Sequence, residues 1–315
     1  MDHPEMTIGI ATYNGQMFLS SVLGTLITAV QGENVEIVIS DNASVDETAN
    51  IAKDFQSRYP DIVRHVRNDR NIGFDANVDN VVRQARGRFV WLMADDDFLL
   101  PGAVDRVLGI IRDHPDLALI FANFSNPIDL GLTKDVFCED GNQFFTYNRF
   151  KNGLLSSNIV NRQTWLDLDM GRFDGSLWIH FAYSINAMAP KEGRKGYLIS
   201  DELIRQDGIG RWGGGGSFIL TGLKLVQLFS NMEDLGYTKK LKKDGDLVIK
   251  KGYLENIPRA KSMGLAVDRD LIDQMRGLYG AYPTFWLLDL PMLIVPNWVY
   301  RIGFKTARKI RHGPG

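Results

Sequence analysis

Three consecutive carboxylates follow a run of apolar residues in the segment RFVWLMADDDFLLPG, residues 88–102. They are Asp95, Asp96 and Asp97, and like charges so close together repel one another. Mg²⁺ or Mn²⁺ bound among them would supply the missing counter-charge, because both cations take oxygen ligands and commonly share them with substrate phosphates. The alternative is a solvated turn, or a cap for a helix that begins near Pro101, which a bare run of three aspartates favours. The position of the run in the fold therefore has to decide between a metal site and a solvated turn or helix cap.

Segments typical of strands and of helices alternate through the first 125 residues. Short runs rich in β-branched and apolar residues predict strands at 7–14, 35–44, 61–69, 88–94 and 117–125. Helical spacing of apolar residues predicts helices at 18–30, 44–58, 75–85 and 102–114. The second of these helices would open with a capping box formed by Ser44 and Glu47. This alternation predicts an α/β domain with a mainly parallel sheet that helices cover on both faces.

In such sheets, ligands bind beyond the carboxyl ends of the strands. The polar segments TYN, SDNAS, NDRNIGFDAN and ADDD follow the first four predicted strands and would gather at that edge. One crevice would then hold polar groups from four loops, with the aspartate run at the end of a strongly apolar strand. At this position, binding of a metal ion and a diphosphate is the better interpretation of the aspartates.

The second half of the chain has weaker patterns. Segments 161–168 and 175–189 look helical, 196–200 looks like a strand, and 217–280 is predicted to form helices. Between them, RQDGIGRWGGGGSF at 205–218 predicts a flexible loop, because four successive glycines favour neither regular state.

The composition is that of an ordinary soluble globular protein, with 315 residues of which 44% are hydrophobic and 23% charged. The net charge of −2 gives no global attraction to nucleic acid, so we expect no nucleic-acid partner. The single cysteine, Cys138, cannot form an internal disulfide, which suggests a reducing compartment but also fits an exported protein without disulfides. Because the N-terminus MDHPEMTIGI also lacks the pattern of a secretory signal, we expect a cytoplasmic protein.

An apolar, aromatic-rich segment, FWLLDLPMLIVPNWVY at 285–300, is too short and too interrupted to span a bilayer, which takes roughly 20 residues. No acidic residue occurs between 301 and 315, and five cations do: Arg301, Lys305, Arg308, Lys309 and Arg311. Aromatic and basic residues in this combination favour the interface of an anionic membrane. We therefore expect 283–312 to hold the protein peripherally on the inner face of the cell membrane. The alternative is a hairpin packed on the domain, with a solvated tail.

Three stretches of the first half, IATYNGQMFLSSVLGTL, VEIVISDNASVDETANIA and NIGFDANVDNVVRQARGRFVWLMADDDFLLPGAV, together resemble the family 2 glycosyltransferases. The likeness covers residues 7 to about 125 and implies the GT-A fold, a Rossmann-like, mainly parallel sheet flanked by helices, here with a helical C-terminal extension. Within the family, the chain looks most similar to abequosyltransferase-like and bacterial O-antigen or capsule-building members. The resemblance implies inverting, metal-dependent transfer of a hexosyl or related sugar from a nucleotide-diphosphate sugar. The acceptor would be a hydroxyl of a polyprenyl- or otherwise lipid-linked glycan, in the synthesis of bacterial lipopolysaccharide or capsule.

The resemblance also implies which residues bind the donor. Those that match the family's nucleotide-sugar motifs are Thr12, Tyr13, Asn14, Asp41, Asn71, Gly73 and Asn77. Asp41 would hydrogen-bond the base, although its segment DNAS could equally form an Asx turn. The segment NIGFDAN, residues 71–77, could likewise be only a turn that leads into a helix.

The family's D-x-D-D motif aligns on Pro101 with one departure, because Ala94 stands where the first carboxylate is usual. Asp95 or Asp96 would then approach the ribose and sugar, and Asp96 or Asp97 would bind Mn²⁺ or Mg²⁺. The sequence leaves this register open.

The general base for the acceptor hydroxyl would lie in GRFDGSLWIHFAY, residues 171–183, which lacks the Glu-Asp pair of many relatives. The candidates are Asp174 and His180. His180 lies nearest the expected position, and an imidazole with a pKa of about 6.5 suits a base near neutrality. A lone histidine on an aromatic-rich helix can equally be structural. In the glycine-rich loop that follows, Arg205 or Arg211 would reach the diphosphate if the loop is a lid rather than a surface connection.

We thus expect a catalytic domain at 1–215 and a helical region at 216–315. The catalytic domain would divide into a nucleotide-sugar-binding half at 1–125 and an acceptor half at 126–215. Two alternatives stay open. A nucleotidyltransferase would normally carry a basic, glycine-rich loop after the first strand, and TYNGQMF has no basic residue. A non-catalytic nucleotide- or carbohydrate-binding protein could keep the fold without a base.

Overall fold

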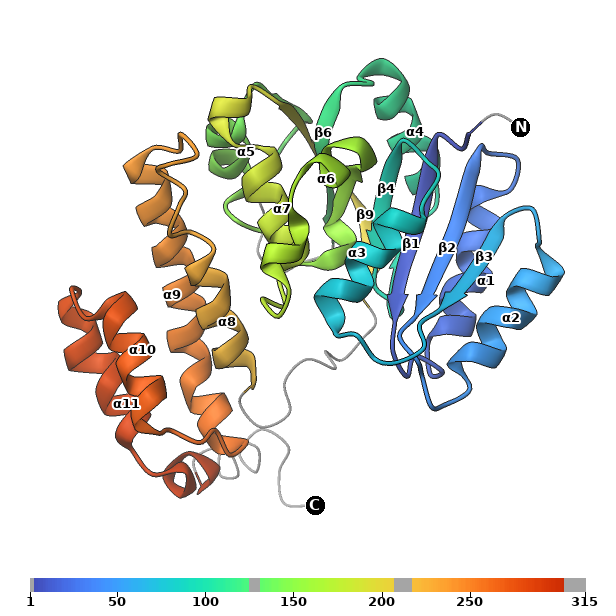
Figure 1. Cartoon of the computed structure of the whole chain (residues 1–315). Helices are drawn as coiled ribbons and strands as arrows, with labels where there is room; N and C mark the ends of the chain where they lie inside the picture. The colour runs from blue at the N-terminus through green and yellow to red at the C-terminus, as the bar shows by residue number, and fades with distance from the viewer. Residues whose placement is uncertain (1–2, 125–130, 207–216, 303–315) are drawn as a thin grey trace. The chain divides into compact units, whose positions relative to one another are not determined.

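The computed structural model describes residues 3–124, 131–206 and 217–302, and the chain divides into two compact units (Figure 1). We call them the sheet unit, residues 1–208 and 231–241, and the helical unit, residues 209–230 and 242–315. The predicted domain boundary between 215 and 216 falls outside the described residues and stays a prediction.

The sheet unit is built on a mixed sheet whose described strands follow the order β3-β2-β1-β4-β8-β6-β9-β5, with β7 beside β9. Their bounds are β1 Met6–Thr12, β2 Val35–Asp41, β3 Val63–Arg67, β4 Phe89–Met93, β5 Asp97–Leu99, β6 Leu117–Phe124, β7 Val136–Cys138, β8 Asn158–Asn161 and β9 Lys195–Gln206. Nearly every residue of β1, β2, β4 and β6 is buried, which explains their continuous apolar runs.

The first four strands along the chain lie side by side and run parallel, as the alternation predicts. In their register, Thr12 pairs with Asp41, and Asp41 pairs with Arg67. The carboxyl ends of β1, β2 and β3 are therefore level, and the loops after them leave from one edge. β8 runs antiparallel between β4 and β6, and β5 runs antiparallel to β9. The sequence patterns missed β5, β7 and β8, because three or four residues are too few to show a period.

Helices cover both faces of this sheet. They are α1 Leu19–Val30, α2 Thr48–Arg58, α3 Phe74–Gln84, α4 Ala103–Asp113, α5 Gly141–Asn148, α6 Arg162–Asp167 and α7 Ile179–Ala187. α1 and α2 lie on one face and α3 lies on the other (Figure 1). The chain moves one way from β1 through β2 to β3 and then returns to β4, and right-handed crossovers place the returning helix on the opposite face. This brings α3 against α7 and the residues just before it.

The predicted capping box at the start of α2 does not form. The helix begins after Glu47, whose side chain makes no capping hydrogen bond. The Ser44 hydroxyl instead accepts the backbone N–H of Asn14 at 2.9 Å, and Asp46 accepts that of Thr48 at 3.0 Å. The prediction was wrong because the Ser44 hydroxyl hydrogen-bonds to the loop after β1, which is distant in sequence, and so does not cap the helix.

The helical unit has its own core. It contains α8 Ser217–Gln227, most of α9 Lys239–Ser262, α10 Arg269–Tyr279, a π-helical turn Phe285–Asp289 and α11 Leu290–Ile294. The buried apolar cluster that joins them includes Leu223, Ile257, Leu271, Phe285 and Leu293. Within the described ranges, no helix is long and apolar enough to cross a membrane.

Candidate functional site

Thr12 and the aspartate run meet at the carboxyl edge of the parallel strands. Thr12 ends β1, is buried, and its Oγ1 donates a hydrogen bond to Asp95 Oδ2 at 2.5 Å. Gly15 lies against the same carboxylate, since a Cβ at this position would come within 2.2 Å of Asp95 Oδ2. A residue without a side chain lets the loop after β1 pass this close. Contacts with Thr12 and Gly15 therefore fix the Asp95 carboxylate at this edge of the sheet.

Asp97 is held by a second hydroxyl. It begins β5, is 3% exposed, and its Oδ2 accepts a hydrogen bond of 2.6 Å from Ser156 Oγ. Burial, joined by repulsion from Asp96 and Asp95, raises the pKa of Asp97 to about 6, although the Ser156 hydrogen bond lowers it. Asp96 lies between the two anchored carboxylates and is more exposed than either.

The aspartate run fits a divalent cation that takes its remaining ligands from a substrate. Burial, with the neighbouring charges of Asp96 and Asp95, raises the pKa of Asp97, so a cation that favours its charged form would find a suitable ligand here. In the part of the chain that the structure describes, no group of three or more Asp, Glu, His or Cys side chains could hold a metal ion by itself. One or two carboxylates combined with phosphates and water are the usual Mg²⁺ environment, and the run can supply that partial set.

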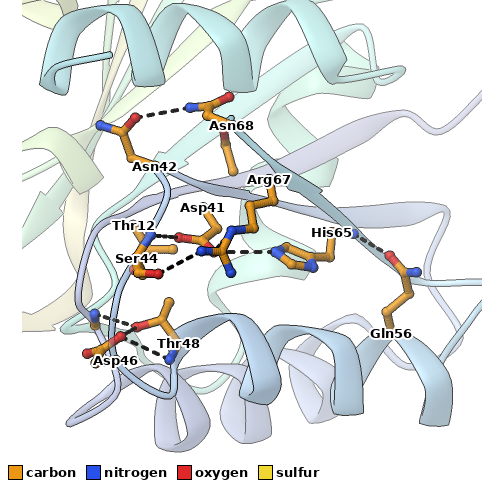
Figure 2. A network of polar contacts seen from close by, with 12 residues as sticks. Thr12, Asp41, Asn42, Ser44, Asp46, Thr48, Gln56, His65, Arg67 and Asn68 are labelled. Atoms are coloured by element: carbon orange, nitrogen blue, oxygen red, sulfur yellow. Dashed lines mark hydrogen bonds and ion pairs between the residues drawn. The ribbon is translucent and has the colours of Figure 1, made fainter. Parts of the chain in front are cut away.

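Asp41, at the end of β2, is fully buried and anchors the loop that follows it (Figure 2). Its Oδ1 accepts the backbone N–H of Ser44 at 2.9 Å, so the local turn expected as the alternative is present. Its Oδ2 has no hydrogen-bond partner among the described groups, and lies 3.7 Å from Arg67 Nε and 3.9 Å from His65 Nε2. Burial lowers the pKa of His65, against the attraction of Asp41. Asp41 thus combines a structural bond on one oxygen with an acceptor oxygen beside the partly exposed Arg67.

Asn14 joins the loops after β1 and β2. It donates its backbone N–H to Ser44 Oγ at 2.9 Å, and its Oδ1 accepts the Val45 N–H at 3.0 Å. Its backbone is left-handed, with φ of 53°, a conformation that asparagine adopts more readily than most residues. The neighbouring Tyr13 is 45% exposed, so its ring faces outward at this edge.

Asparagine side chains hold the loop after β3 against β2. Asn42 donates to Asn71 Oδ1 at 2.9 Å and to the Gly73 carbonyl at 3.1 Å. Asn68 donates to Asn42 Oδ1 at 3.1 Å (Figure 2), and to Asn77 Oδ1 at 3.0 Å. The predicted residues Asn71 and Asn77 therefore shape the loop from within the protein. Sequence reasoning missed Asn42 and Asn68, whose partners lie on other elements.

Asp75, in the first turn of α3, positions the segment that precedes α7. It is buried, its Oδ2 accepts the Leu177 N–H at 2.7 Å, and its Oδ1 accepts the Ile179 N–H at 3.1 Å. Burial raises the pKa of Asp75, and the nearby charge of Asp174 adds to the effect. Sequence reasoning missed this residue, although an acid in the first turn of a helix is a recognised signal of a favourable dipole contact.

The two candidate bases lie in different surroundings. His180 is buried in α7, and its Nε2 lies 2.9 Å from the Gly153 carbonyl. Because a carbonyl only accepts, Nε2 carries the proton, and Nδ1 is buried without a hydrogen-bond partner in the described ranges. Burial lowers the pKa of His180 to about 4, against the effect of the Gly153 hydrogen bond. Asp174 is exposed, and its Oδ1 accepts the Gly175 N–H at 3.0 Å.

The predicted lid at 205–218 is only partly described, and Arg211 falls outside the described residues. Arg205 lies in β9 and not in a loop as predicted. It pairs with Phe98 of β5, and its guanidinium carbon is 5.3 Å from the centre of that ring. The next residue, Gln206, pairs with Asp97. The strand is longer than predicted because β5, which the pattern missed, supplies its partner.

Residues 7–162 match the family model described as Glycosyl transferase family 2. The chain belongs to glycosyltransferase family 2. The match begins in β1 and extends through β8, so it contains the parallel strands and the aspartate run. The expected family is therefore confirmed, whereas its abequosyltransferase-like subgroup stays a prediction.

Curated relatives of this family 2 chain include two glycosyltransferases. The GalNAc(5)-diNAcBac-PP-undecaprenol beta-1,3-glucosyltransferase of Campylobacter jejuni is 24% identical over 204 residues, 58% of this chain and 64% of the relative. An uncharacterized glycosyltransferase of Methanocaldococcus jannaschii is 25% identical over 123 residues, 39% of this chain and 42% of the relative. The matches thus span less than two thirds of these relatives' lengths.

Solved structures resemble the chain over most of its length. Residues 1–349 of Staphylococcus aureus TarS, in complex with UDP, give a TM-score of 0.61 at 13% identity, covering 89% of this chain and 81% of that one. The mannosyltransferase PcManGT of Pyrobaculum calidifontis, in complex with GDP-Man and Mn²⁺, gives 0.57 at 14% identity, covering 93% and 86%. At such low identity the likeness concerns the fold, and it confirms the expected GT-A architecture.

Proposed function

We propose that this family 2 glycosyltransferase moves a sugar from a nucleoside-diphosphate sugar to a hydroxyl of a lipid-linked glycan, with inversion and with help from Mn²⁺ or Mg²⁺. The process served would be the synthesis of a bacterial surface polysaccharide. The observation that carries the proposal is the aspartate run, in which two hydroxyl-anchored carboxylates flank the more exposed Asp96 at the carboxyl edge of the sheet. Relatives point the same way, since PcManGT is described with GDP-Man and Mn²⁺ and the Campylobacter jejuni relative is named for an undecaprenol-linked substrate.

The donor would bind across the ends of β1, β2 and β4. Asp41 Oδ2, which lacks a hydrogen-bond partner among the described groups, would accept an N–H of the base, and the exposed ring of Tyr13 would pack beside it. Asp96 and Asp97 would hold the cation. When bound, that cation would neutralise the charge that grows on the departing diphosphate.

The acceptor hydroxyl would lose its proton to Asp174. This carboxylate is exposed, and Asp75 fixes the segment that carries it against α3. A pKa near 4 makes the buried His180 a weak base at neutral pH, and its protonated Nε2 is committed to a carbonyl. We therefore place Asp174 ahead of His180, which reverses the order inferred from sequence.

A pair of variants tests the base. Asp174→Asn should lower turnover about 10²- to 10⁴-fold while donor binding is unchanged, because a general base contributes that much to the rate. His180→Gln keeps a donor for the Gly153 carbonyl and should keep turnover within a few fold. The opposite pattern, with His180→Gln inactive and Asp174→Asn active, would restore His180 as the base.

A thermal-shift screen tests the donor and the cation together. UDP-, GDP- and CDP-sugars are each added with and without Mn²⁺, because a ligand that binds the folded state raises Tm. We expect one sugar nucleotide to raise Tm much more when Mn²⁺ is present than in EDTA. A donor that binds equally well in EDTA would reject the metal assignment, and binding without turnover would favour the non-catalytic alternative.

The helical unit would attach the enzyme to the inner face of the membrane. Between 286 and 302 it exposes a set of large apolar side chains, namely Trp286, Leu287, Leu288, Ile294, Trp298, Val299 and Ile302. The acid within this segment, Asp289, is turned inward onto Lys250 at 3.3 Å. Cations follow from Arg301 onward in the sequence. An apolar face without exposed acids and with basic neighbours suits an anionic lipid surface, where a lipid-linked acceptor would be found.

A further inference from the structure

Ser156 links the aspartate run to the second half of the sheet unit. The residue is fully buried, and its Oγ accepts the Ala94 N–H at 2.9 Å and donates to Asp97 Oδ2 at 2.6 Å. Since a backbone N–H can only donate, the hydroxyl proton is left for the carboxylate. The direction of the bond is thus fixed, and one oxygen of Asp97 has a fixed place.

The backbone of Ser156 is held as firmly as its side chain. Trp91 Nε1 donates to the Ser156 carbonyl at 2.8 Å. Trp91 is fully buried in β4, where it pairs with Ile159 of β8. The short turn Leu155–Ser157 is therefore docked onto the end of β4 through both main chain and side chain.

His180 and Asn158 secure the residues that lead into this turn. Asn158 Nδ2 donates to the Leu154 carbonyl at 2.7 Å and to the Asn152 carbonyl at 3.1 Å. His180 Nε2 donates to the Gly153 carbonyl at 2.9 Å. The segment before Ser156 is thus fixed between α7 and β8, and the place of the Asp97 carboxylate depends on it.

We propose that Ser156 is a positioning residue that orients Asp97 for the cation, an inference that rests on the proposed function. Repulsion from Asp95 and Asp96 favours rotation of the Asp97 carboxylate away from its neighbours. The Ser156 hydroxyl opposes that rotation and keeps the oxygens of the run in one arrangement before the cation arrives. Groups that hydrogen-bond metal ligands commonly set metal affinity in this way.

The test compares two neighbouring serines. Ser156→Ala removes the hydroxyl that holds Asp97. Ser157→Ala is the matched control, because Ser157 is equally buried and donates to the Leu154 carbonyl at 2.7 Å instead. Mn²⁺ binding is measured by electron paramagnetic resonance in saturating UDP or GDP, after thermal melting has shown that both variants fold. We expect Ser156→Ala to bind Mn²⁺ about 10- to 100-fold more weakly, and Ser157→Ala to bind like the unmodified protein.

The outcomes separate this proposal from the function on which it rests. Mn²⁺ affinity unchanged by Ser156→Ala would overturn the positioning role and leave the proposed function intact. Absence of nucleotide-dependent Mn²⁺ binding by the unmodified protein would reject the metal-dependent function itself and the positioning role with it. General damage would also weaken nucleotide binding in EDTA, which a positioning role leaves unchanged. If Ser156→Ala does not fold, Ser156→Cys and Ser157→Cys repeat the comparison, because a thiol has a similar shape but donates weakly.

Discussion

The sheet unit and the helical unit use buried charge in opposite ways. Four buried aspartates lie at or beside the carboxyl edge of the sheet: Asp41, Asp75, Asp95 and Asp97. Their partners are mainly hydroxyl and backbone N–H groups, and only Asp41 has a cation within ion-pair distance among the described residues. In the helical unit, the described residues include one buried carboxylate, Asp289, and Lys250 pairs with it.

The two units also differ in how many large apolar side chains they expose. Of the fifteen large hydrophobic side chains that the described residues expose, ten belong to the helical unit. The printed partners of the buried aspartates in the sheet unit are thus mainly hydrogen-bond donors, whereas Asp289 of the helical unit pairs with a lysine. Most of the exposed large apolar side chains lie in the helical unit. Buried carboxylates with raised pKa values, such as Asp75 and Asp97, point to a functional site, and exposed apolar side chains point to a partner.

The largest effect should come from Asp97→Asn. We expect sugar transfer to fall at least about a thousandfold, because the cation loses a charged ligand. The ligand-free protein should become more stable at pH 7, since the Asp97 pKa of about 6 lies above its ordinary value of 3.8. The protonated form of such a group contributes its full stability below about pH 4, and this contribution is lost as the pH rises through 6. Asparagine cannot ionise, so the variant should regain up to about 3 kcal/mol in the free energy of unfolding at pH 7. Urea unfolding at pH 4 and pH 7 measures the difference.

This prediction has a built-in control, because the asparagine oxygen can still accept the Ser156 hydroxyl. A gain in stability with loss of transfer would mark Asp97 as a residue kept for function. Equal stability at pH 7 would mean that the charge is already compensated in the free protein, and the comparison between the units would break.

Lys250→Met should destabilise the helical unit, in contrast to the stabilisation expected for Asp97→Asn. Asp289 is fully buried, so loss of its lysine leaves an uncompensated charge and should cost about 3–5 kcal/mol. Removing both charges in Lys250→Met with Asp289→Leu should recover most of that cost. Thermal unfolding of the three proteins measures this cycle. If the single variant is as stable as the double, the pair is not a buried ion pair in solution.

His180→Gln should change the acid stability of the sheet unit. The His180 pKa of about 4 lies below its ordinary value of 6.5, so the native state prefers the neutral ring. Its contribution is complete above pH 6.5 and is lost as the pH falls towards 4, by up to about 3 kcal/mol. Glutamine does not titrate and should flatten this part of the profile. Urea unfolding between pH 7 and 4.5 tests it, and an unchanged slope would show that the ring is accessible to water.

Leu287→Ser with Leu288→Ser should have the smallest effect, confined to membrane binding. Each leucine is more than half exposed, so the fold should tolerate serine. Loss of both side chains should weaken binding to anionic vesicles about tenfold or more, as expected for removing two leucines from an apolar interface. Tyr147→Ser, an exposed position of the sheet unit, is the control. These substitutions test membrane binding more specifically than deletion of residues 283–315 would, because the deletion would also remove Phe285 and Leu293 from the core of the helical unit. Vesicle sedimentation that does not change would remove the membrane from the proposal.

The parallel half of the fold could be predicted because its signals are local. β1, β2 and β4 are continuous apolar runs, and the helices after them repeat apolar residues with helical spacing. The short strands β5, β7 and β8 carry no such signal and form because longer strands pair with them. Arg205 was placed in a loop for this reason, since the strand that holds it depends on β5.

The candidate site divides in the same way. Thr12, Asp41 and the aspartate run could be located because Thr12 and Asp41 end recognisable strands and the aspartate run follows one. Their partners could not, because Ser156 follows Asp97 by 59 residues and Leu177 follows Asp75 by 102. The environment of His180 could not be predicted either, since its burial results from packing against other segments.

Local patterns in the sequence predict the order of strands and helices in the first half, the edge at which polar loops gather, and the type of chemistry that three adjacent carboxylates suit. These follow from side-chain periodicity and composition, which act over a few neighbouring residues. Packing in the folded protein sets which aspartates are anchored, which candidate base is exposed and which apolar residues of the helical unit are exposed. Those outcomes depend on hydrogen bonds and burial between segments far apart in the chain, and a local pattern does not specify its distant partner.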